Sequence, residues 1–411
     1  MTTVPRVAIV GVGQSKRNYV YSKKKGWKGV VTEAAYAALK DANMEAKEID
    51  GGIANYHGEN WMGYGGIGPT MSDELGICPV AFTPIVAQCT GGGVTAMHGW
   101  TSVASGLRKR VLCIAFDSED CISNLDNYNI SDDTDWDYMT GLGHMDVMWL
   151  REQAYYRKYG YGLEVAAKWV QQCLWYANRN PRAARYGSPI PPTEQMLQTI
   201  IPGNKSPTLF AQADRWAPAQ GAAAFILVPA EEAQRYTKTP VYLDGVEYGA
   251  YPTLFSKDVH YPKPQLEKSD VTELPNARWA AEKAYRMAGI KPEEISLAGV
   301  YANTLSGILL LEALGIAPIG KAGQFVLDGE TEVDGKCPTC TDGGTVGFSI
   351  TSGAEVGDMI VEATHQLRGE VDLPSRQVKD PQVAVCGGYQ AVGSGCTVTV
   401  LTNRKERRGQ G

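Results

Sequence analysis

The sequence lacks most features of membrane, secreted and nucleic-acid-binding proteins. No apolar run approaches the roughly 20 residues that cross a bilayer, and the start MTTVPRVAIVGVG lacks a signal-peptide layout. Nine cysteines in 411 residues are too sparse for a disulfide framework. The 39 basic and 45 acidic residues give a net charge of −6, which argues against a general nucleic-acid binder. We therefore expect a cytoplasmic enzyme or binding protein.

Metal-binding patterns are also scarce. Only five histidines occur, and none belongs to a metal-spaced pair. Cys337 and Cys340 form a lone CPTC sequence, whereas tetrahedral zinc needs four ligands. We therefore expect no metal in this chain and interpret the CPTC segment as a loop that lines the functional site.

Alternating strand and helix patterns are present. Val7–Gly11 and Val111–Phe116 are continuously apolar, which is typical of buried strands. Thr32–Ala42 has apolar residues at helical spacing, with Thr32 as the candidate N-cap. The alternation predicts an α/β fold with a mostly parallel sheet covered by helices.

The sequence also repeats itself. Ala42–Asp50 (ANMEAKEID) aligns with Ala288–Ser296 (AGIKPEEIS) at an offset of 246, and each follows an Ala-rich helix and precedes a short strand. This repetition predicts two similar halves, residues 1–240 and 241–411. An insertion over about 118–218 interrupts the first half.

The insertion is rich in Trp, Tyr, Asn and Pro, and its clearest element is a helix over Leu163–Asn178. Trp136, Trp149 and Trp216 lie in or beside it. His144, in GLGHMDVMW, also lies there and could face a cleft.

Cys89 is the strongest candidate for a catalytic residue. It lies in AQCTGGGVTAMHGW, between an apolar run and a predicted helix. A thiol at a helix N-terminus is favoured as thiolate, the nucleophilic form, and the following glycines would let a substrate approach the backbone. A small buried residue in a tight turn is the alternative interpretation.

Cys386 is a second candidate, at the end of a predicted strand in PQVAVCGGYQAVGSG. A thiol followed by Gly-Gly can supply a proton carrier and a nearby backbone N–H for an oxyanion. A buried strand cysteine is again the alternative.

Taken in order, these segments resemble the thiolase superfamily over nearly the whole chain. The strand, cysteine and Gly-rich helix at Cys89 resemble the superfamily's nucleophile motif, and CGGYQA resembles its C-terminal Cys-x-Gly-Gly motif. Tyr156–Ala183 is similar to a stretch of the superfamily's loop domain in which a helix ends in Asn-Pro. The segment AQGAAAFILVP is similar to the strand that closes the first half. Gly299–Gly315 is similar to the segment that contains an oxyanion motif and an E-A-L-G helix. The nearest resemblance is to the sterol-carrier-protein type and to the thiolase subunit of bacterial benzoylsuccinyl-CoA thiolase.

The sequence departs from the superfamily at two motifs. The Gly-His-Pro motif expected after Gly343-Gly344 is absent, and Ser349 and Ile350 occupy that region. The Asn-Glu-Ala-Phe segment reads Tyr301-Ala-Asn303-Thr. Without the histidine we expect a less activated Cys89, whose acylation depends on pH between about 7 and about 9.

The resemblance implies a five-layer αβαβα fold with an inserted loop domain, and thiolytic cleavage of a 3-oxoacyl-CoA with coenzyme A as co-substrate. It implies that Cys89 accepts the acyl group, that Cys386 carries protons, and that the Gly388 N–H with the Cys89 N–H holds an oxyanion. Asn303 is the candidate donor for a second oxyanion hole. The tryptophan-rich insertion suits an aromatic acyl group such as benzoylsuccinyl.

Two other functions remain open at this point. One is retro-aldol cleavage of a 3-hydroxyacyl-CoA side chain, with Tyr301 as the proton carrier. The other is a non-catalytic scaffold that binds acyl-CoA or lipid. For partners, the resemblance implies a thiolase-type homodimer and a small zinc-ribbon/OB-fold subunit.

Overall fold

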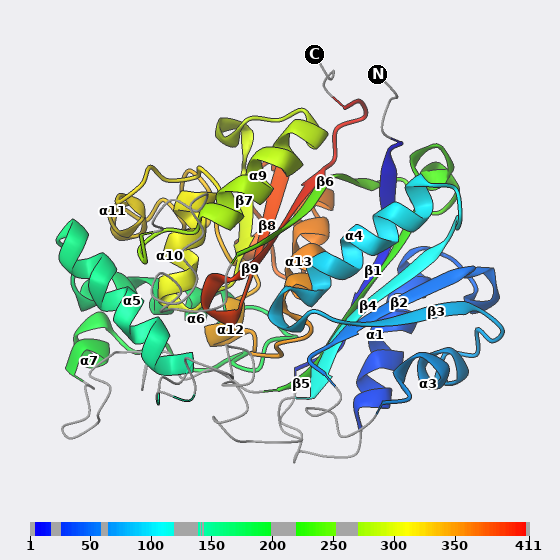
Figure 1. Cartoon of the computed structure of the whole chain (residues 1–411), viewed down its shortest axis with the longest axis horizontal. Coiled ribbons are helices and arrows are strands. Elements are labelled where there is room, and N and C mark those ends of the chain that lie inside the picture. The colour runs from blue at the N-terminus through cyan, green and yellow to red at the C-terminus, as the bar shows by residue number, and fades with distance from the viewer. Residues whose placement is uncertain are drawn as a thin grey trace.

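The computed structural model describes residues 5–17, 26–58, 65–118, 139, 141, 144–198, 219–251 and 270–407. Within them, nine strands form one sheet in the order β3-β2-β4-β5-β1-β6-β9-β8-β7 (Figure 1). The first five strands are β1 (Val7–Gln14), β2 (Gly51–Tyr56), β3 (Ala81–Val86), β4 (Val111–Ser118) and β5 (Gln220–Pro229). The others are β6 (Val241–Ala250), β7 (Leu297–Val300), β8 (Val383–Gln390) and β9 (Gly395–Thr402).

The sheet is mixed, so the expectation of a mostly parallel sheet is wrong. Only the pairs β2–β3, β2–β4 and β7–β8 are parallel among the described strands, and the strands between β4 and β8 pair antiparallel. A strand buried on both faces has the same apolar run whichever way its neighbour points. Apolar runs therefore reveal burial but not strand direction.

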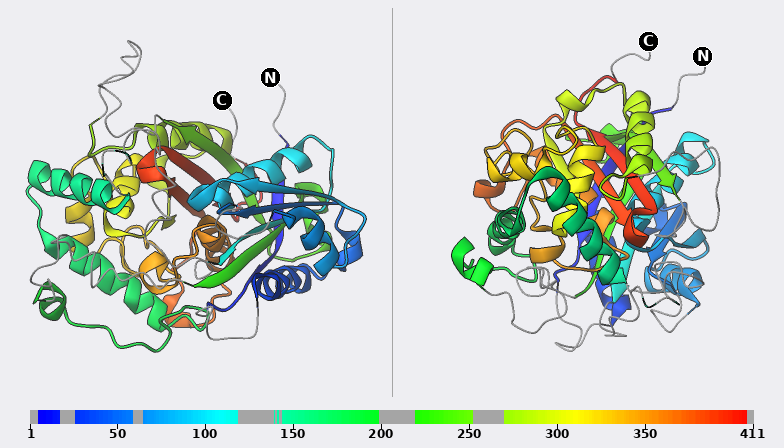
Figure 2. Two further views of the ribbon diagram at one scale, coloured as in Figure 1. Left: turned by 60° about the horizontal axis from the view of Figure 1, so that its bottom comes forward. Right: turned by 60° about the vertical axis from the view of Figure 1, so that its left-hand side comes forward.

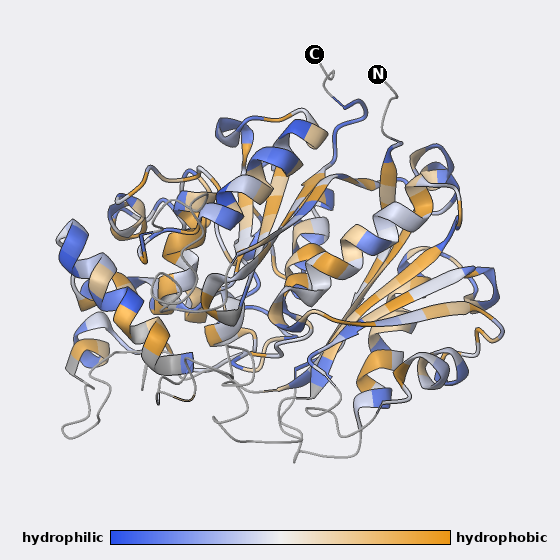
Figure 3. Cartoon of the chain, viewed as in Figure 1, coloured by the Kyte–Doolittle hydropathy of each residue, from blue (hydrophilic) through white to orange (hydrophobic). Residues whose placement is uncertain are grey.

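Helices cover the sheet in layers, and the predicted five-layer arrangement is confirmed. Helices α4 (Gly91–Ala104) and α13 (Glu355–Arg368) lie between the two parts of the sheet, which are strands β3-β2-β4-β5-β1 and strands β6-β9-β8-β7 (Figure 2). Helix α1 (Trp27–Asp41) packs on the outer face of β1 and β5, and α9 (Pro275–Ala288) packs outside β6 and β9. The strands are the most apolar elements in view, whereas the outer helices carry polar faces (Figure 3).

The remaining described helices outside the insertion are short or belong to the side layers. They are α3 (Ile67–Glu74), α10 (Thr304–Ala313), α11 (Ala322–Leu327) and α12 (Gly344–Gly347). Across the described ranges, none of the helices has the length and apolarity that crossing a bilayer requires.

The N-terminus of α1 differs from the expectation. The helix begins at Trp27 after Gly26, and Thr32 lies inside it, where its hydroxyl donates to the Lys28 carbonyl at 2.8 Å. The preceding turn is helical because Val30 and Val31 continue the buried stripe. Thr32 is therefore not the N-cap.

The sequence repeat has a structural counterpart. Ala46–Glu48 and Pro292–Glu294 both form 3₁₀ turns, and the same offset of 246 relates them. Each turn joins an outer helix, α1 or α9, to the next strand. The boundary near residue 240 remains a prediction.

The described part of the insertion is helical. It contains α5 (His144–Tyr159), α6 (Leu163–Asn178) and α7 (Thr193–Gln198), which lie beside the C-terminal part of the chain (Figures 1 and 2). The bounds of α6 are those that the sequence predicts. The fully buried Trp169 of α6 donates its indole N–H to the Ala302 carbonyl at 2.8 Å, which fixes the insertion to the start of α10. Trp136 and Trp216 lie outside the described residues, as does the side chain of Trp149.

Candidate active site

Cys89 lies in a tight turn between β3 and α4. The segment Gln88–Thr90 is a 3₁₀ turn, and α4 begins at Gly91. Gln88 has a φ of +44°, a left-handed conformation that costs a non-glycine residue about 1–3 kcal/mol. Cys89 is 8% exposed. The structure therefore places this thiol at a helix N-terminus, where the sequence predicts it.

Asn55 at the end of β2 holds this turn in place. Its Oδ1 accepts from the Ala87 N–H at 2.9 Å, and its Nδ2 donates to the Gly353 carbonyl at 2.9 Å. A Cβ on Gly91 would lie 1.7 Å from Asn55 Nδ2. One side chain thus connects the turn before α4 to the loop before α13.

The three glycines after Thr90 serve packing rather than the predicted approach of a substrate. The Asn55 side chain fills the space beside Gly91. The α13 backbone at Gly357 fills the space beside Gly92, and the Thr397 side chain fills the space beside Gly93. These neighbours belong to three different elements, so sequence spacing alone does not reveal them.

Strand β8 meets the Cys89 turn through its last residues. A Cβ on Gly388 would lie 3.4 Å from Thr90 Cα, and the Thr90 hydroxyl donates to Gln390 Oε1. Cys386 lies two residues earlier on the same face of the strand and is fully buried. The structure thus brings Gly388 to the turn of Cys89, and Cys386 lies two residues before Gly388 on the same face of β8.

Burial raises the pKa of the Cys386 thiol to about 12, although a hydrogen bond with Thr399 opposes the shift. The cause is the loss of water around the charged thiolate. Cys386 is therefore a thiol near neutral pH and can act first as an acid.

Asn303 is fully buried at the N-cap of α10. Its Oδ1 accepts from the Ser306 N–H at 3.0 Å, which is the cap expected of an asparagine. Its Nδ2 lies 4.0 Å from the Met148 sulfur of α5. The amide oxygen is thus committed to the helix, while the amide nitrogen faces the insertion.

The segment that replaces the Gly-His-Pro motif is a neutral, hydrogen-bonded one. Ser349 Oγ accepts from Arg17 Nε at 2.9 Å and lies 3.0 Å from Thr351 Oγ1, which donates to the Ala219 carbonyl at 3.0 Å. Because Thr351 donates to Ala219, the Ser349 hydroxyl donates to Thr351. Ile350 is fully buried between them.

A buried ion pair supports this segment. The Arg17 guanidinium bonds both carboxylate oxygens of Asp358 on α13, and each residue is 2% exposed. Arg17 also lies over the Phe348 ring, 4.9 Å from its centroid. A buried pair of this kind is strongly destabilised when one partner is removed, so the two residues fix the loop in one position.

Sequence reasoning did not single out His57 and Asp117 as site residues. His57 directly follows β2, Asp117 lies near the end of β4, and His57 Nδ1 is 3.8 Å from Asp117 Oδ2. Asp117 also accepts from the Gly353 N–H at 3.1 Å. Burial, with a smaller effect of His144, lowers the pKa of His57 to about 3. The signal that could have identified them is polar residues at the carboxyl ends of neighbouring parallel strands.

The CPTC segment borders β7. Thr339 forms a parallel bridge with Ala298, and the Cys340 thiol donates to the Val300 carbonyl at 3.2 Å. Both cysteines are buried, and burial raises the pKa of Cys337 to about 12. Within the described ranges, no group of three or more His, Cys, Asp or Glu side chains could hold a metal ion.

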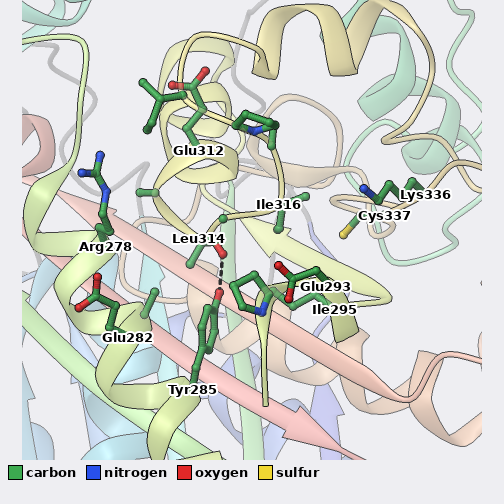
Figure 4. A pocket seen from close by; sticks show the side chains of 17 residues that line it. Arg278, Glu282, Tyr285, Glu293, Ile295, Glu312, Leu314, Ile316, Lys336 and Cys337 are labelled. Atoms are coloured by element: carbon green, nitrogen blue, oxygen red, sulfur yellow. Dashed lines mark hydrogen bonds between the residues drawn. The ribbon is translucent and has the colours of Figure 1, made fainter.

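Cys337 lines an outer pocket of about 530 Å³ instead of the space near Cys89 (Figure 4). Arg278 and Glu282 of α9 form one wall, and Glu293 and Lys336 lie across from them. Leu310 and Leu314 of α10 pack on β8 at Gly387, the face opposite to that of Gly388. Strand β8 therefore separates this pocket from the Cys89 turn.

Comparison with known proteins assigns this architecture to a family. Residues 260–403 match the family model described as "Thiolase C-terminal domain-like". An acetyl-CoA acetyltransferase of Methanothermobacter thermautotrophicus is 27% identical over 400 residues, covering 96% of this chain and 99% of the relative. The chain thus resembles proteins of the thiolase superfamily over nearly its whole length. The predicted superfamily and the predicted enzyme class, an acyltransferase, are thus confirmed.

Two further proteins are similar to this chain over nearly its whole length. The benzoylsuccinyl-CoA thiolase subunit BbsB of Thauera aromatica is 25% identical over 401 residues, covering 95% of each chain. The solved structure of an Ltp2-ChsH2(DUF35) aldolase superposes with a TM-score of 0.80 at 22% identity, covering 98% of this chain and 99% of the other. Relatives named for acyl transfer therefore resemble this chain in sequence, and a protein named as an aldolase resembles it in fold.

Proposed function

We propose that this protein cleaves a 3-oxoacyl-CoA with coenzyme A, or runs the reverse condensation, through an acyl thioester on Cys89. The observation that carries the proposal is the position of Cys89 in the strained turn at the N-terminus of α4, against Gly388 of β8. A nucleophile on a turn held by Asn55 is presented in one orientation, which reduces the entropy lost on the way to the transition state.

The cleavage proceeds in two halves. The Cys89 thiolate attacks the C3 carbonyl carbon, the C2–C3 bond breaks, and its electron pair passes to C2 of the departing acyl-CoA. After that carbanion is protonated and leaves, the thiolate of coenzyme A attacks the Cys89 thioester. The shortened acyl-CoA forms, and Cys89 is released as the thiolate that began the reaction.

Cys386 is the proposed proton carrier for both halves. The raised pKa of its thiol keeps the proton in place at rest, so Cys386 can protonate the carbanion. The thiolate that results is a stronger base than the thiolate of coenzyme A, with an ordinary thiol pKa of about 8.5, and it takes the proton of the incoming thiol. The Cys386 side chain is then a neutral thiol again.

Backbone and amide N–H groups are the proposed oxyanion donors. The N–H groups of Cys89 and Gly388 would hold the thioester oxyanion, and Asn303 Nδ2 would hold the enolate oxygen of the departing acyl-CoA. The capping of α10 by Asn303 supports this role, because it fixes the amide plane.

The acyl group that we propose is aromatic, with benzoylsuccinyl-CoA as the first substrate to test. Similarity to BbsB at 25% identity supports this choice. A second subunit of the zinc-ribbon/OB-fold type is proposed on the same grounds, since the relative is named as a subunit and the aldolase structure contains a DUF35 protein.

We propose a homodimer that forms through β3. This strand is at the edge of the sheet, all six of its residues are exposed or half-buried, and Val86 is 56% exposed. An exposed edge strand presents unpaired N–H and carbonyl groups to a second chain. Because β3 leads directly into the Cys89 turn, the same contact would steady the site.

Retro-aldol cleavage is the second candidate function, and Tyr301 favours it. Tyr301 directly follows β7, its side chain is buried, and its ring centroid lies 5.8 Å from that of Tyr389 in CGGYQ. In this reaction Tyr301 would take the proton of a 3-hydroxyl group, and neither cysteine would react. The superposition with an aldolase supports the comparison.

One experiment separates the three functions. The full chain is mixed with acetoacetyl-CoA, benzoylsuccinyl-CoA or a 3-hydroxyacyl-CoA, each with and without coenzyme A, beside the Cys89→Ala variant. Consumption of coenzyme A with an acyl adduct on the Cys89 peptide, both lost in the variant, is the expected result. Cleavage of a 3-hydroxyacyl-CoA that survives Cys89→Ala would instead support the aldolase, and binding without turnover would support the scaffold.

A further inference from the structure

Arg151 in α5 is a buried arginine whose hydrogen bonds reach two distant segments of the chain. Its side chain is 7% exposed. Its Nε donates to the Val271 carbonyl at 2.7 Å and its Nη2 to the Glu273 carbonyl at 3.0 Å, both just before α9. Its Nη1 donates to the Tyr389 hydroxyl at 3.3 Å and to the Val392 carbonyl. One side chain of the insertion thus joins the start of α9 to the turn between β8 and β9.

The four acceptors that Arg151 bonds in the described part of the chain are neutral. Three are backbone carbonyls and one is a phenolic hydroxyl. A guanidinium that leaves water without a carboxylate loses hydration energy that no opposite charge restores. Its planar fork of five donors, however, fixes the relative positions of the groups that it bonds. These contacts are therefore suited to holding backbone segments in place rather than to forming a stabilising ion pair.

The turn that Arg151 holds is strained. Val392 has a φ of +45°, which is rare for a β-branched residue, and Gly393 after it has a φ of +99°. The Val392 side chain packs on two hydrophobic residues of α5, and a Cβ on Gly393 would lie 2.8 Å from Arg151 Nη1. On the other side, Asn276 of α9 donates to the Gly393 carbonyl at 2.9 Å. A strained conformation persists only where its neighbours impose it, so the turn depends on α5 and α9.

This turn directly follows the part of β8 that meets the proposed nucleophile. Gly388, whose N–H is a proposed oxyanion donor, comes directly before Tyr389. Gln390, directly after Tyr389, accepts from the hydroxyl of Thr90. The guanidinium bonds lie on both sides of Gln390, at Tyr389 and at Val392. A shift of the turn would therefore move the end of β8 relative to the start of α4.

We propose that Arg151 is a positioning residue, which holds the Gly388 N–H where it can bond the thioester oxyanion. This inference rests on the proposed function. An oxyanion donor is effective only when it is already aimed at the position where the charge develops. A misplacement of about 1 Å, even one caused far from the reacting atoms, can slow a reaction roughly 100-fold. Asn55 holds the Cys89 turn from the opposite side, so Cys89 keeps its position when Arg151 is replaced.

The test compares two reactions of Cys89 in the full chain, both read as the mass of the Cys89 peptide. Acylation by acetoacetyl-CoA forms an oxyanion, whereas alkylation by iodoacetamide displaces iodide at a saturated carbon and forms none. In Arg151→Gln we expect the single-turnover rate of acylation at saturating acetoacetyl-CoA to fall roughly 100-fold. The half-saturating concentration and the alkylation rate should stay close to those of wild type. Arg157→Gln, at an exposed position of the same helix, is the matched control.

Arg151→Lys is the second variant, for the case in which Arg151→Gln does not fold. Lysine keeps the charge and most of the apolar stem, but its single ammonium cannot bond all four acceptors. We expect its acylation rate to lie between those of wild type and Arg151→Gln, again with unchanged alkylation. Urea unfolding establishes that each variant measured is folded.

The outcomes separate this inference from the proposed function. Parallel slowing of acylation and alkylation would show that Arg151 supports the site as a whole, and wild-type acylation in the folded variants would show that β8 needs no such support. Either result overturns the inference. If wild-type Cys89 is alkylated but acetoacetyl-CoA and benzoylsuccinyl-CoA never acylate it, the proposed function fails, and the inference fails with it.

Discussion

Gly92 of α4 and Gly357 of α13 face each other so closely that a Cβ on Gly92 would lie 2.0 Å from the Gly357 backbone nitrogen. Cys89 lies in the turn directly before α4, and α13 follows the loop that replaces the Gly-His-Pro motif. The distance between the two central helices therefore sets the distance between the nucleophile and that loop.

Gly92→Ala should accordingly damage both stability and catalysis. The added methyl group must push α13 away, and overpacking of a core typically costs about 1–3 kcal/mol. We expect a lower midpoint in urea unfolding and slower alkylation of Cys89. Gly26→Ala is the matched control, since no atom lies within 4 Å of its Cβ position. Equal stabilities of the two variants would show that the helices can separate freely.

Asn55→Asp tests whether the Cys89 turn depends on one side chain. The substitution keeps the shape and the acceptor for Ala87 but removes the Nδ2 donor to Gly353 and places a carboxylate near the thiol. Loss of a buried donor typically costs about 1–3 kcal/mol. We expect reduced stability and an alkylation rate of Cys89 that falls below that of wild type at pH 7. An unchanged rate would mean that the turn is held by its own backbone.

Labelling should identify Cys89 as the reactive thiol, once Cys78 and Cys121, which lies outside the described residues, are both replaced. Cys78 is exposed, whereas the other seven described cysteines are buried. In a background that carries Cys78→Ser and Cys121→Ser, limiting iodoacetamide should modify the Cys89 peptide first. The pKa values of four of its competitors are raised by burial: Cys113, Cys337, Cys386 and Cys396. First labelling of Cys337 or Cys340 would contradict the assignment.

The CPTC segment should bind no zinc in this chain. Two thiols supply only half of a tetrahedral site, and the Cys340 thiol is bonded to the Val300 carbonyl. Metal analysis of the purified full chain should find well below one equivalent of zinc. A full equivalent that disappears in Cys337→Ser would show that the segment is a metal site.

Local periodicity accounts for what could be predicted from the sequence. Helix α6 has the predicted bounds because its apolar stripe is local, and Cys89 lies at a helix start because the glycines and the strand before it are adjacent in sequence. Strand direction, the Asn55 bridge and the Arg17–Asp358 pair depend on residues far apart in the chain. Local sequence patterns do not predict such contacts, so these parts of the site are known only from the folded structure.

Glu152 should make the stability of the protein depend on pH. Burial raises its pKa from 4.5 to about 7, against a smaller opposing effect of the Tyr156 hydroxyl. The folded protein thus holds this proton more tightly than the unfolded chain, so the full stability is present below about pH 4.5 and is lost as pH rises towards 7. The shift corresponds to about 2–3 kcal/mol between those limits. In Glu152→Gln that part of the loss should vanish, because the amide does not ionise. Urea unfolding at pH 5 and pH 8 measures the difference, with Glu231→Gln as the exposed control. An equal decline in wild type and Glu152→Gln would mean that other buried acids, such as Asp342 with its pKa raised to about 7, account for the whole effect.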